Sequence, residues 1–186
     1  MRILVLSLAA MTLSACGQQQ PSNASACARS ATHSVLWTSA DAPDVITTTA
    51  DGPSCAQAVV TFVARNADGD PLWAFASTYY DLTAGGVPPE GAPDVTPAQV
   101  DAFLESWANV TVSTTGALPE WREGVATLTE SATVFSYETP FEREVYQMMR
   151  ARNATMICLA AAVEGTQCLV IDPASNAPTM IVAYGP

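Results

Sequence analysis

The sequence predicts an α+β fold in which an antiparallel β-sheet, built from hairpins and a C-terminal meander, packs with two main helices and carries two disulfides. Three observations predict this class: β-rich segments on either side of turn sequences, two segments with helical periodicity, and an even set of cysteines in the body of the chain. The length of 186 residues fits one domain with a well-buried core.

Strand signals dominate the first half of the chain. Residues 56–65 and 72–80 are β-rich runs on either side of the turn sequence NADGDP, so they predict a β-hairpin. Two shorter strands are expected at 34–39 and 44–49, where β-branched residues lie beside turns that contain Asp and Pro. The Pro- and Gly-rich residues 81–97 predict a long loop.

An amphipathic helix is expected from Pro97 to Asn109. Thr96 and Gln99 have the spacing of a capping box, and Pro97 suits the first helical position. Apolar residues then recur at intervals of three and four on one face: Val100, Phe103, Leu104 and Trp107.

The second half predicts another helix and a closing meander. Helical periodicity covers residues 140–153, and a strand is expected at 132–138, whereas residues 118–129 favour neither structure. Three strands in succession are expected at 154–163, 166–172 and 179–184.

The N-terminus has the pattern of an export signal, since a positive charge at Arg2 precedes an apolar run that is too short to span a bilayer. The run ends in Leu13-Ser14-Ala15-Cys16, which resembles the lipobox of bacterial lipoproteins. The resemblance implies that residues 1–15 are a signal peptide, that cleavage follows Ala15, and that a diacylglycerol is attached to the thiol of Cys16. An ordinary secretory signal with an accidental cysteine is the alternative.

The same resemblance implies a location. Gly17 stands where an aspartate would retain a Gram-negative lipoprotein in the inner membrane, so the implied location is the outer membrane, lipid-anchored and facing the periplasm. In a Gram-positive source the anchor would lie on the plasma membrane surface. Residues 16–26 are polar and predict a lipidated, flexible tether, and residues 27–186 predict a single globular domain.

Assigning Cys16 to lipid leaves four cysteines. An even set in an exported chain indicates disulfides, because the compartment is oxidising. Four cysteines allow three pairings, and we favour Cys27–Cys55 and Cys158–Cys168.

The second pairing makes a geometric prediction. A three- or five-residue turn centred on Val163 would place Cys158 directly opposite Cys168 on neighbouring strands, at a Cα distance that a disulfide can bridge. A two-residue turn at Glu164–Gly165 would shift this register and separate the two thiols.

Charge excludes some partners. The seven basic residues are all arginine and face 18 acidic residues, for a net charge of −11. Such a chain should repel nucleic acid and anionic headgroups, so we expect no nucleic-acid partner and contact with the membrane only through the N-terminal lipid.

No motif predicts an enzyme, a cofactor or a metal site. The single histidine, His33, has no recognisable nucleophile beside it, and the common hydrolase and zinc-protease motifs are absent. Asn66, Asp68 and Asp70 alternate around Gly69 as at the start of a calcium loop, but the closing glutamate is missing and a hairpin turn explains them better. We therefore name no catalytic residue.

Carboxylates leave one enzymatic alternative open. Glu120 with Glu123, or two residues of the group Glu138, Glu142 and Glu144, could form the acid–base pair of a hydrolase that acts on an envelope polymer. Acidic residues at helix ends explain the same residues without catalysis.

Aromatic residues suggest a binding surface. Tyr79 and Tyr80 stand at the mouth of the predicted loop, and neighbouring strand residues point to opposite faces, so at least one ring is expected at the surface. Trp73 and Trp107 are expected in the core. The sequence thus favours a non-catalytic binding module with an envelope protein or polymer as its partner, and a purely structural envelope protein is the third possibility.

Overall fold

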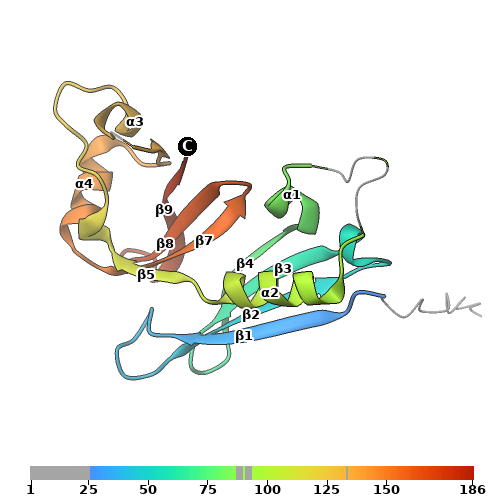
Figure 1. Ribbon diagram of the computed structural model, residues 1–186. Helices are drawn as coiled ribbons and strands as arrows, with labels where there is room; N and C mark the ends of the chain where they lie inside the picture. The colour runs from blue at the N-terminus through green and yellow to red at the C-terminus, as the bar shows by residue number, and fades with distance from the viewer. Residues whose placement is uncertain (1–25, 87–89, 91–93, 133) are drawn as a thin grey trace, which may run out of the picture.

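The computed structural model describes residues 26–86, 90, 94–132 and 134–186, and its strands form two antiparallel sheets (Figure 1). The first sheet contains, in spatial order, β1 (Arg29–Val35), β2 (Asp44–Asp51), β3 (Val59–Arg65) and β4 (Pro71–Thr78). The second contains β5 (Thr111–Thr114), β7 (Thr155–Ala162), β8 (Gly165–Asp172), β9 (Ala177–Gly185) and β6 (Ser136–Glu138). The predicted α+β class is confirmed, with the strands divided between two sheets.

Two longer and several short helices connect the strands. The longer ones are α2 (Pro97–Ala108) and α4 (Arg143–Ala151), and the short ones are α1 (Tyr79–Thr83), α3 (Leu128–Ser131) and the 3₁₀ turns η1 (Cys55–Gln57) and η2 (Thr115–Ala117). The predicted capping box is present in α2, because Gln99 N donates to Thr96 Oγ1 and Thr96 N donates to Gln99 Oε1. The helix at 97–109 is thereby confirmed almost to the residue.

The hairpin and its turn are also confirmed. β3 pairs with β4, and the Asn66 side chain organises the turn by accepting hydrogen bonds from the backbone N–H groups of Asp68 and Asp70. Gly69 has a φ of +89°, a conformation that suits glycine. The alternating Asn66, Asp68 and Asp70 are therefore explained by the structure of this turn.

Several boundaries differ from the prediction. The first strand is β1 at 29–35 instead of 34–39, because its mostly exposed residues at the sheet edge lack an apolar signal. The strand expected at 132–138 is only β6, and it follows the short helix α3. β5 was not predicted. The loop was expected to begin at residue 81, but α1 extends over its first residues, to Thr83.

The central strands of the second sheet are buried on both faces. Ile157, Leu159 and Leu169 face a core shared with α2 and the first sheet. Residues of the opposite face, including Cys158 and Cys168, join a second core with α4. Strands covered on both sides have continuous apolar runs, as β7 and β8 do, instead of alternating polar and apolar residues.

Both predicted disulfides are present, and Cys158 lies directly opposite Cys168 in the ladder of β7 and β8. Ala162 pairs with Gly165 around a tight turn, but the register shifts between Ala160 and Ala162. This β-bulge adds one residue to β7 and so brings the two cysteines into register, with their Cα atoms 4.1 Å apart. The predicted opposition is therefore correct, and a bulge beside the turn produces it.

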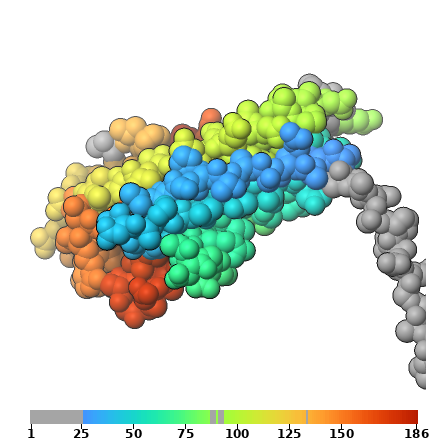
Figure 2. Space-filling model, turned by 90° about the horizontal axis from the view of Figure 1, so that it is seen from below, coloured from blue at the N-terminus to red at the C-terminus, as the bar shows by residue number. Residues whose placement is uncertain are grey.

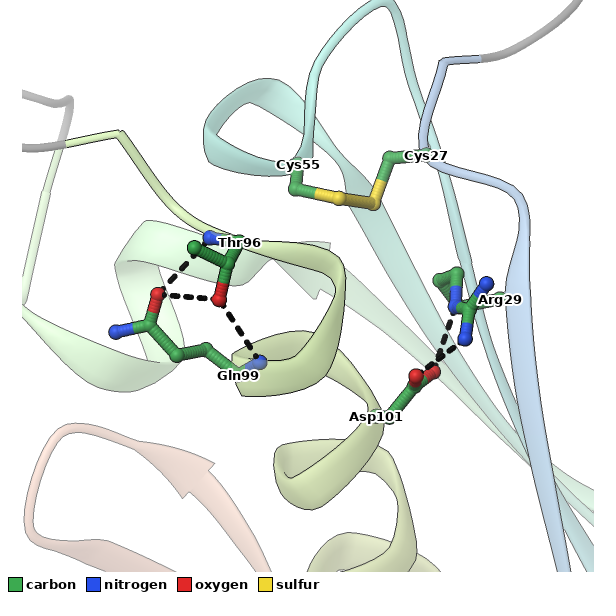
Figure 3. Close-up of polar contacts among 6 residues, drawn as sticks. All are labelled: Cys27, Arg29, Cys55, Thr96, Gln99 and Asp101. Carbon is green, nitrogen blue, oxygen red and sulfur yellow. Dashed lines mark hydrogen bonds and ion pairs between the residues drawn. A yellow bond between two sulfur atoms is a disulfide. The ribbon is translucent and has the colours of Figure 1, made fainter.

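The start of the described chain is fixed by a disulfide and an ion pair (Figure 3). The Cys27–Cys55 disulfide ties the segment before β1 to η1, with Cα atoms 4.9 Å apart. Two residues later, Arg29 Nε donates to Asp101 Oδ1 of α2 at 2.6 Å, and the guanidinium forms a second, parallel contact with the same carboxylate. Figure 2 shows the result, with α2 and β1 side by side along one face.

Candidate functional site

The outer edge of the second sheet carries a cluster of aromatic side chains. β6 pairs with the C-terminal end of β9 and places Tyr137 opposite Tyr184, with ring centroids 5.1 Å apart and planes 30° apart. Phe135 packs against both rings, at 6.4 Å from Tyr137 and 5.6 Å from Tyr184. With the neighbouring Val134, these residues form what we call the β6 patch.

Hydrogen bonds hold the short strand in place although it has only three residues. Thr129 of α3 donates from its hydroxyl to the carbonyl oxygen of Tyr137. On the far side of the strand, Thr139 Oγ1 donates to the carbonyl oxygen of Ile181 at 2.7 Å. Side-chain hydrogen bonds therefore hold the strand at its middle residue and just beyond its C-terminal end.

The β6 patch is exposed. Val134 is 78% exposed and Phe135 is 43% exposed, which is unusual for large apolar side chains adjacent in the chain. Tyr137 and Tyr184 are half-buried. Partial burial raises the pKa of the Tyr137 phenol, and the neighbouring Tyr184 raises it further. Both effects favour the neutral phenol, so the patch carries aromatic surface without charge.

Three shallow hollows adjoin β6. A hollow of about 230 Å³ is lined by Ser136, Glu138 and the ends of β7, β8 and β9. A second, of about 390 Å³, lies between Val134, Tyr137 and the segment around Glu120. A third, of about 350 Å³, is lined by Trp121, Tyr137 and residues near α3. The aromatic surface is thus bordered by depressions into which side chains of a partner could fit.

The carboxylates considered for catalysis do not converge in these hollows. Glu138 lines two of the three and Glu120 lines the other, so each hollow has one carboxylate among the described residues that line it. Glu123, Glu142 and Glu144 line none of them. Within the described residues, no group of three or more His, Cys, Asp or Glu side chains is placed to hold a metal ion.

Tyr79 and Tyr80 lie elsewhere, and their setting differs from the one predicted. They begin α1 instead of ending a strand, because Thr78 caps that helix by accepting a hydrogen bond from Asp81 N. The Tyr79 ring packs edge-on against Phe103 at 5.3 Å, and both tyrosines are half-buried. The alternation argument for exposure therefore does not apply, and Tyr79 belongs to the border of the first core.

The remaining candidate residues are accounted for as follows. His33 is exposed on the edge strand β1. Trp107 is buried and its Nε1 donates to the carbonyl oxygen of Ala160, whereas Trp73 is half-buried.

Cys16 and the tether up to residue 25 lie outside the described residues. In the part of the chain that is described, no helix has the length and apolar character needed to cross a membrane.

Sequence reasoning did not single out the β6 patch. Phe135 and Tyr137 were assigned to a predicted strand and Tyr184 to another, but nothing in the sequence indicated that these two strands pair. The usable signal was the adjacent Val134 and Phe135 in a segment otherwise rich in Ser and Thr.

Comparisons with known proteins identify no relative. No family model, no curated protein and no solved structure matches the chain.

Proposed function

We propose that this protein is a non-catalytic binding module of the cell envelope, held at the outer membrane by lipid on Cys16 and facing the periplasm. Its binding surface is the β6 patch, and its partner is another envelope protein. The observation that carries the proposal is the exposed aromatic and apolar surface of Val134, Phe135, Tyr137 and Tyr184.

The chemistry of the patch suits a protein partner. Aromatic side chains are enriched in the central part of protein–protein interfaces, where they bury a large area at low cost in conformational entropy. Here the rings already pack against one another, so little of their freedom remains to be lost on binding. Side chains of a complementary partner surface could fit into the adjoining hollows.

The position of the patch suits an anchored protein. Figure 1 shows β6, α3 and the C-terminal end of β9 at the end of the molecule opposite to the start of β1. A lipid anchor placed before β1 would therefore leave the patch directed away from the attachment point and accessible to partners.

The hydrolase alternative has less support. General acid–base cleavage of a glycosidic bond needs two carboxyl groups that face one substrate, whereas each hollow beside the patch is lined by one. A purely structural role gives no reason for keeping Phe135 and Val134 at the surface.

The proposal is tested by in-cell cross-linking of the lipidated protein, followed by identification of the linked proteins. We compare the unaltered chain with Phe135→Ser and with the matched control Val59→Thr, which changes an apolar residue that is 49% exposed on the first sheet. We expect one set of adducts with the unaltered chain and the control, and its loss with Phe135→Ser. Identical adducts from all three chains would contradict the proposal, and adducts to polymer alone would replace the protein partner by a polymer.

A further inference from the structure

Tyr137 and Tyr184 form a close pair of phenols. They lie directly opposite each other in the antiparallel ladder of β6 and β9, with ring centroids 5.1 Å apart and planes 30° apart. At such a separation the nearest ring carbons are in or near van der Waals contact, which is about 3.5–4.0 Å between carbon atoms. Small motions of either side chain therefore bring the edges of the two rings together.

Contacts around the pair limit how far the rings can separate. Phe135 packs against both of them, at 6.4 Å from Tyr137 and 5.6 Å from Tyr184. The hydroxyls of Thr129 and Thr139 donate to the carbonyl oxygens of Tyr137 and Ile181, and so hold β6 against its surroundings. Two reactive groups held in this way avoid most of the entropic cost of their encounter.

Both tyrosines can be reached from solvent. Each is half-buried, and Tyr184 lines the hollow of about 230 Å³ whereas Tyr137 lines the other two hollows beside β6. Across residues 26–86, 90, 94–132 and 134–186, neither phenolic hydroxyl forms a hydrogen bond. Each phenol is therefore able to release its proton to water.

The other three tyrosines are arranged differently. Tyr146 is fully buried, and its hydroxyl donates to the carbonyl oxygen of Pro119. Tyr79 and Tyr80 are neighbours in the chain, but their ring planes are 75° apart and their centroids 6.4 Å apart, with the Tyr79 ring against Phe103. The pair on β6 and β9 is thus the one whose rings are placed to react with each other.

We propose that Tyr137 and Tyr184 are a site of oxidative modification, at which a peroxidase that consumes hydrogen peroxide joins the two rings as dityrosine. Each phenol loses one electron and its hydroxyl proton, and the two phenoxyl radicals couple through a carbon ortho to each oxygen. The carbon–carbon bond forms, the hydrogens on these two carbons return to the oxygens through solvent, and both hydroxyls are restored. The two electrons and two protons that are lost convert one hydrogen peroxide into two waters.

The cross-link would make the pairing of β6 with β9 permanent. β6 has three residues and pairs with β9 at the edge of the second sheet, and neither disulfide includes either of these strands. The inference does not rest on the proposed function, because it needs the geometry of the two rings and no binding partner. Binding at the β6 patch and coupling of the tyrosines therefore fail separately.

The test oxidises the full-length chain that carries Cys16→Ser, which removes the proposed lipidation site, with a haem peroxidase and limiting hydrogen peroxide. Because every Lys or Arg position is arginine, trypsin places the tyrosines in separate peptides, apart from the adjacent Tyr79 and Tyr80. Tyr137 falls in residues 123–143, Tyr184 in 153–186, Tyr146 in 144–150, and Tyr79 with Tyr80 in 66–122. Mass spectrometry therefore assigns each linked pair without ambiguity.

We expect peptides 123–143 and 153–186 to be joined, with two hydrogens fewer than the sum of their compositions. This pair should be at least about tenfold more abundant than any other linked pair, because its rings are held together before oxidation. An equal mixture of ¹⁴N- and ¹⁵N-labelled chains shows that the bond is intramolecular, since linkage between molecules would join light with heavy peptides.

Matched variants identify the reacting groups. Tyr137→Phe removes one phenol and keeps the aromatic ring, so it should abolish the linked pair. Tyr80→Phe is the control and should leave the pair unchanged. A light-activated ruthenium complex, with persulfate as electron acceptor, repeats the oxidation with a much smaller oxidant that does not need to dock on the protein.

Three results would overturn the inference. The first is the absence of the link between peptides 123–143 and 153–186 with both oxidants. The second is a product in which light and heavy peptides are joined as often as random encounter predicts. The third is an undiminished link between these peptides in Tyr137→Phe.

Discussion

Replacing Cys27 and Cys55 together by alanine removes the disulfide that fixes the start of β1. These cysteines are separated by 28 residues in sequence, and those of the other disulfide by 10. The chain-entropy model assigns about 3.6 kcal/mol to the longer loop and about 2.8 kcal/mol to the shorter one. The difference, about 0.8 kcal/mol, is what loop length alone contributes.

The two pairs of cysteines are buried to a similar extent, so the two double variants can be compared directly. Cys27 and Cys55 are 0% and 6% exposed, and Cys168 and Cys158 are 0% and 7% exposed. The cost of the small cavity that each cysteine-to-alanine change leaves should therefore be similar for the two pairs. Subtracting one double variant from the other leaves mainly the loop-closure entropy of the unfolded chain.

The measurement is equilibrium unfolding in urea, followed by tryptophan fluorescence, on the Cys16→Ser chain and both double-alanine variants. Loop closure alone should lower the free energy of unfolding by about 3.6 kcal/mol without Cys27–Cys55, which corresponds to about 7–14 °C in Tm, and the cavity cost adds to this fall. The fall should be smaller without Cys158–Cys168. A larger loss from the shorter loop would refute the entropic reasoning and would mean that the β7–β8 disulfide stabilises the native sheet directly.

Three further predictions concern the anchor and two ionisable groups. Mass spectrometry of the mature protein should show acyl mass on an N-terminal Cys16, and Cys16→Ser should release the protein from the membrane fraction; a free thiol at Cys16 would refute the anchor. Burial raises the pKa of the Tyr146 phenol, whose hydroxyl donates to the carbonyl oxygen of Pro119. This group therefore contributes stability below pH about 10, and the contribution is lost as pH rises further. Tyr146→Phe should cost about 0.5–1.5 kcal/mol at neutral pH and flatten the alkaline part of the stability curve, so an unchanged alkaline slope would argue against this assignment. The hydrogen bond from Arg29 lowers the pKa of Asp101, so the ion pair stabilises the fold above pH about 4 and is lost in more acidic solution. Asp101→Asn should reduce the loss of stability on acidification, and an unaltered acid limb in urea unfolding would contradict this.

Residue spacing in the sequence predicted the elements whose contacts join residues a few positions apart. The capping box of Thr96 and Gln99 and the turn built around Asn66 form between residues a few positions apart, so the spacing was sufficient. The pairing of Cys158 with Cys168 followed from the short connection between adjacent strands. Setting Cys16 aside leaves four cysteines, and this even number favoured two disulfides.

Elements that depend on distant partners were misplaced or missed. β1 has little apolar signal because it lies at a sheet edge, and β5 has four residues that are defined by pairing with β7. The β6 patch forms because Tyr137 pairs with Tyr184, and only the register of β6 on β9 brings them together. Tyr79 and Tyr80 were assigned to the end of a strand, but the cap at Thr78 starts a helix where the β-rich composition predicted a continuing strand.

The position of the Cys27–Cys55 disulfide has a mechanical consequence for an anchored protein. β1 is an edge strand held to one neighbour, and a pull on its N-terminal end would separate its hydrogen bonds from β2 one after another. The disulfide lies ahead of β1 and transfers tension directly from Cys27 to Cys55, beyond β2. The β1–β2 hairpin is therefore outside the covalent path of the load. If the protein is anchored through Cys16 and binds a partner at the β6 patch, as we propose, a pull between the two would pass through the disulfide to η1 and β3, and the edge strand would not be separated from the sheet.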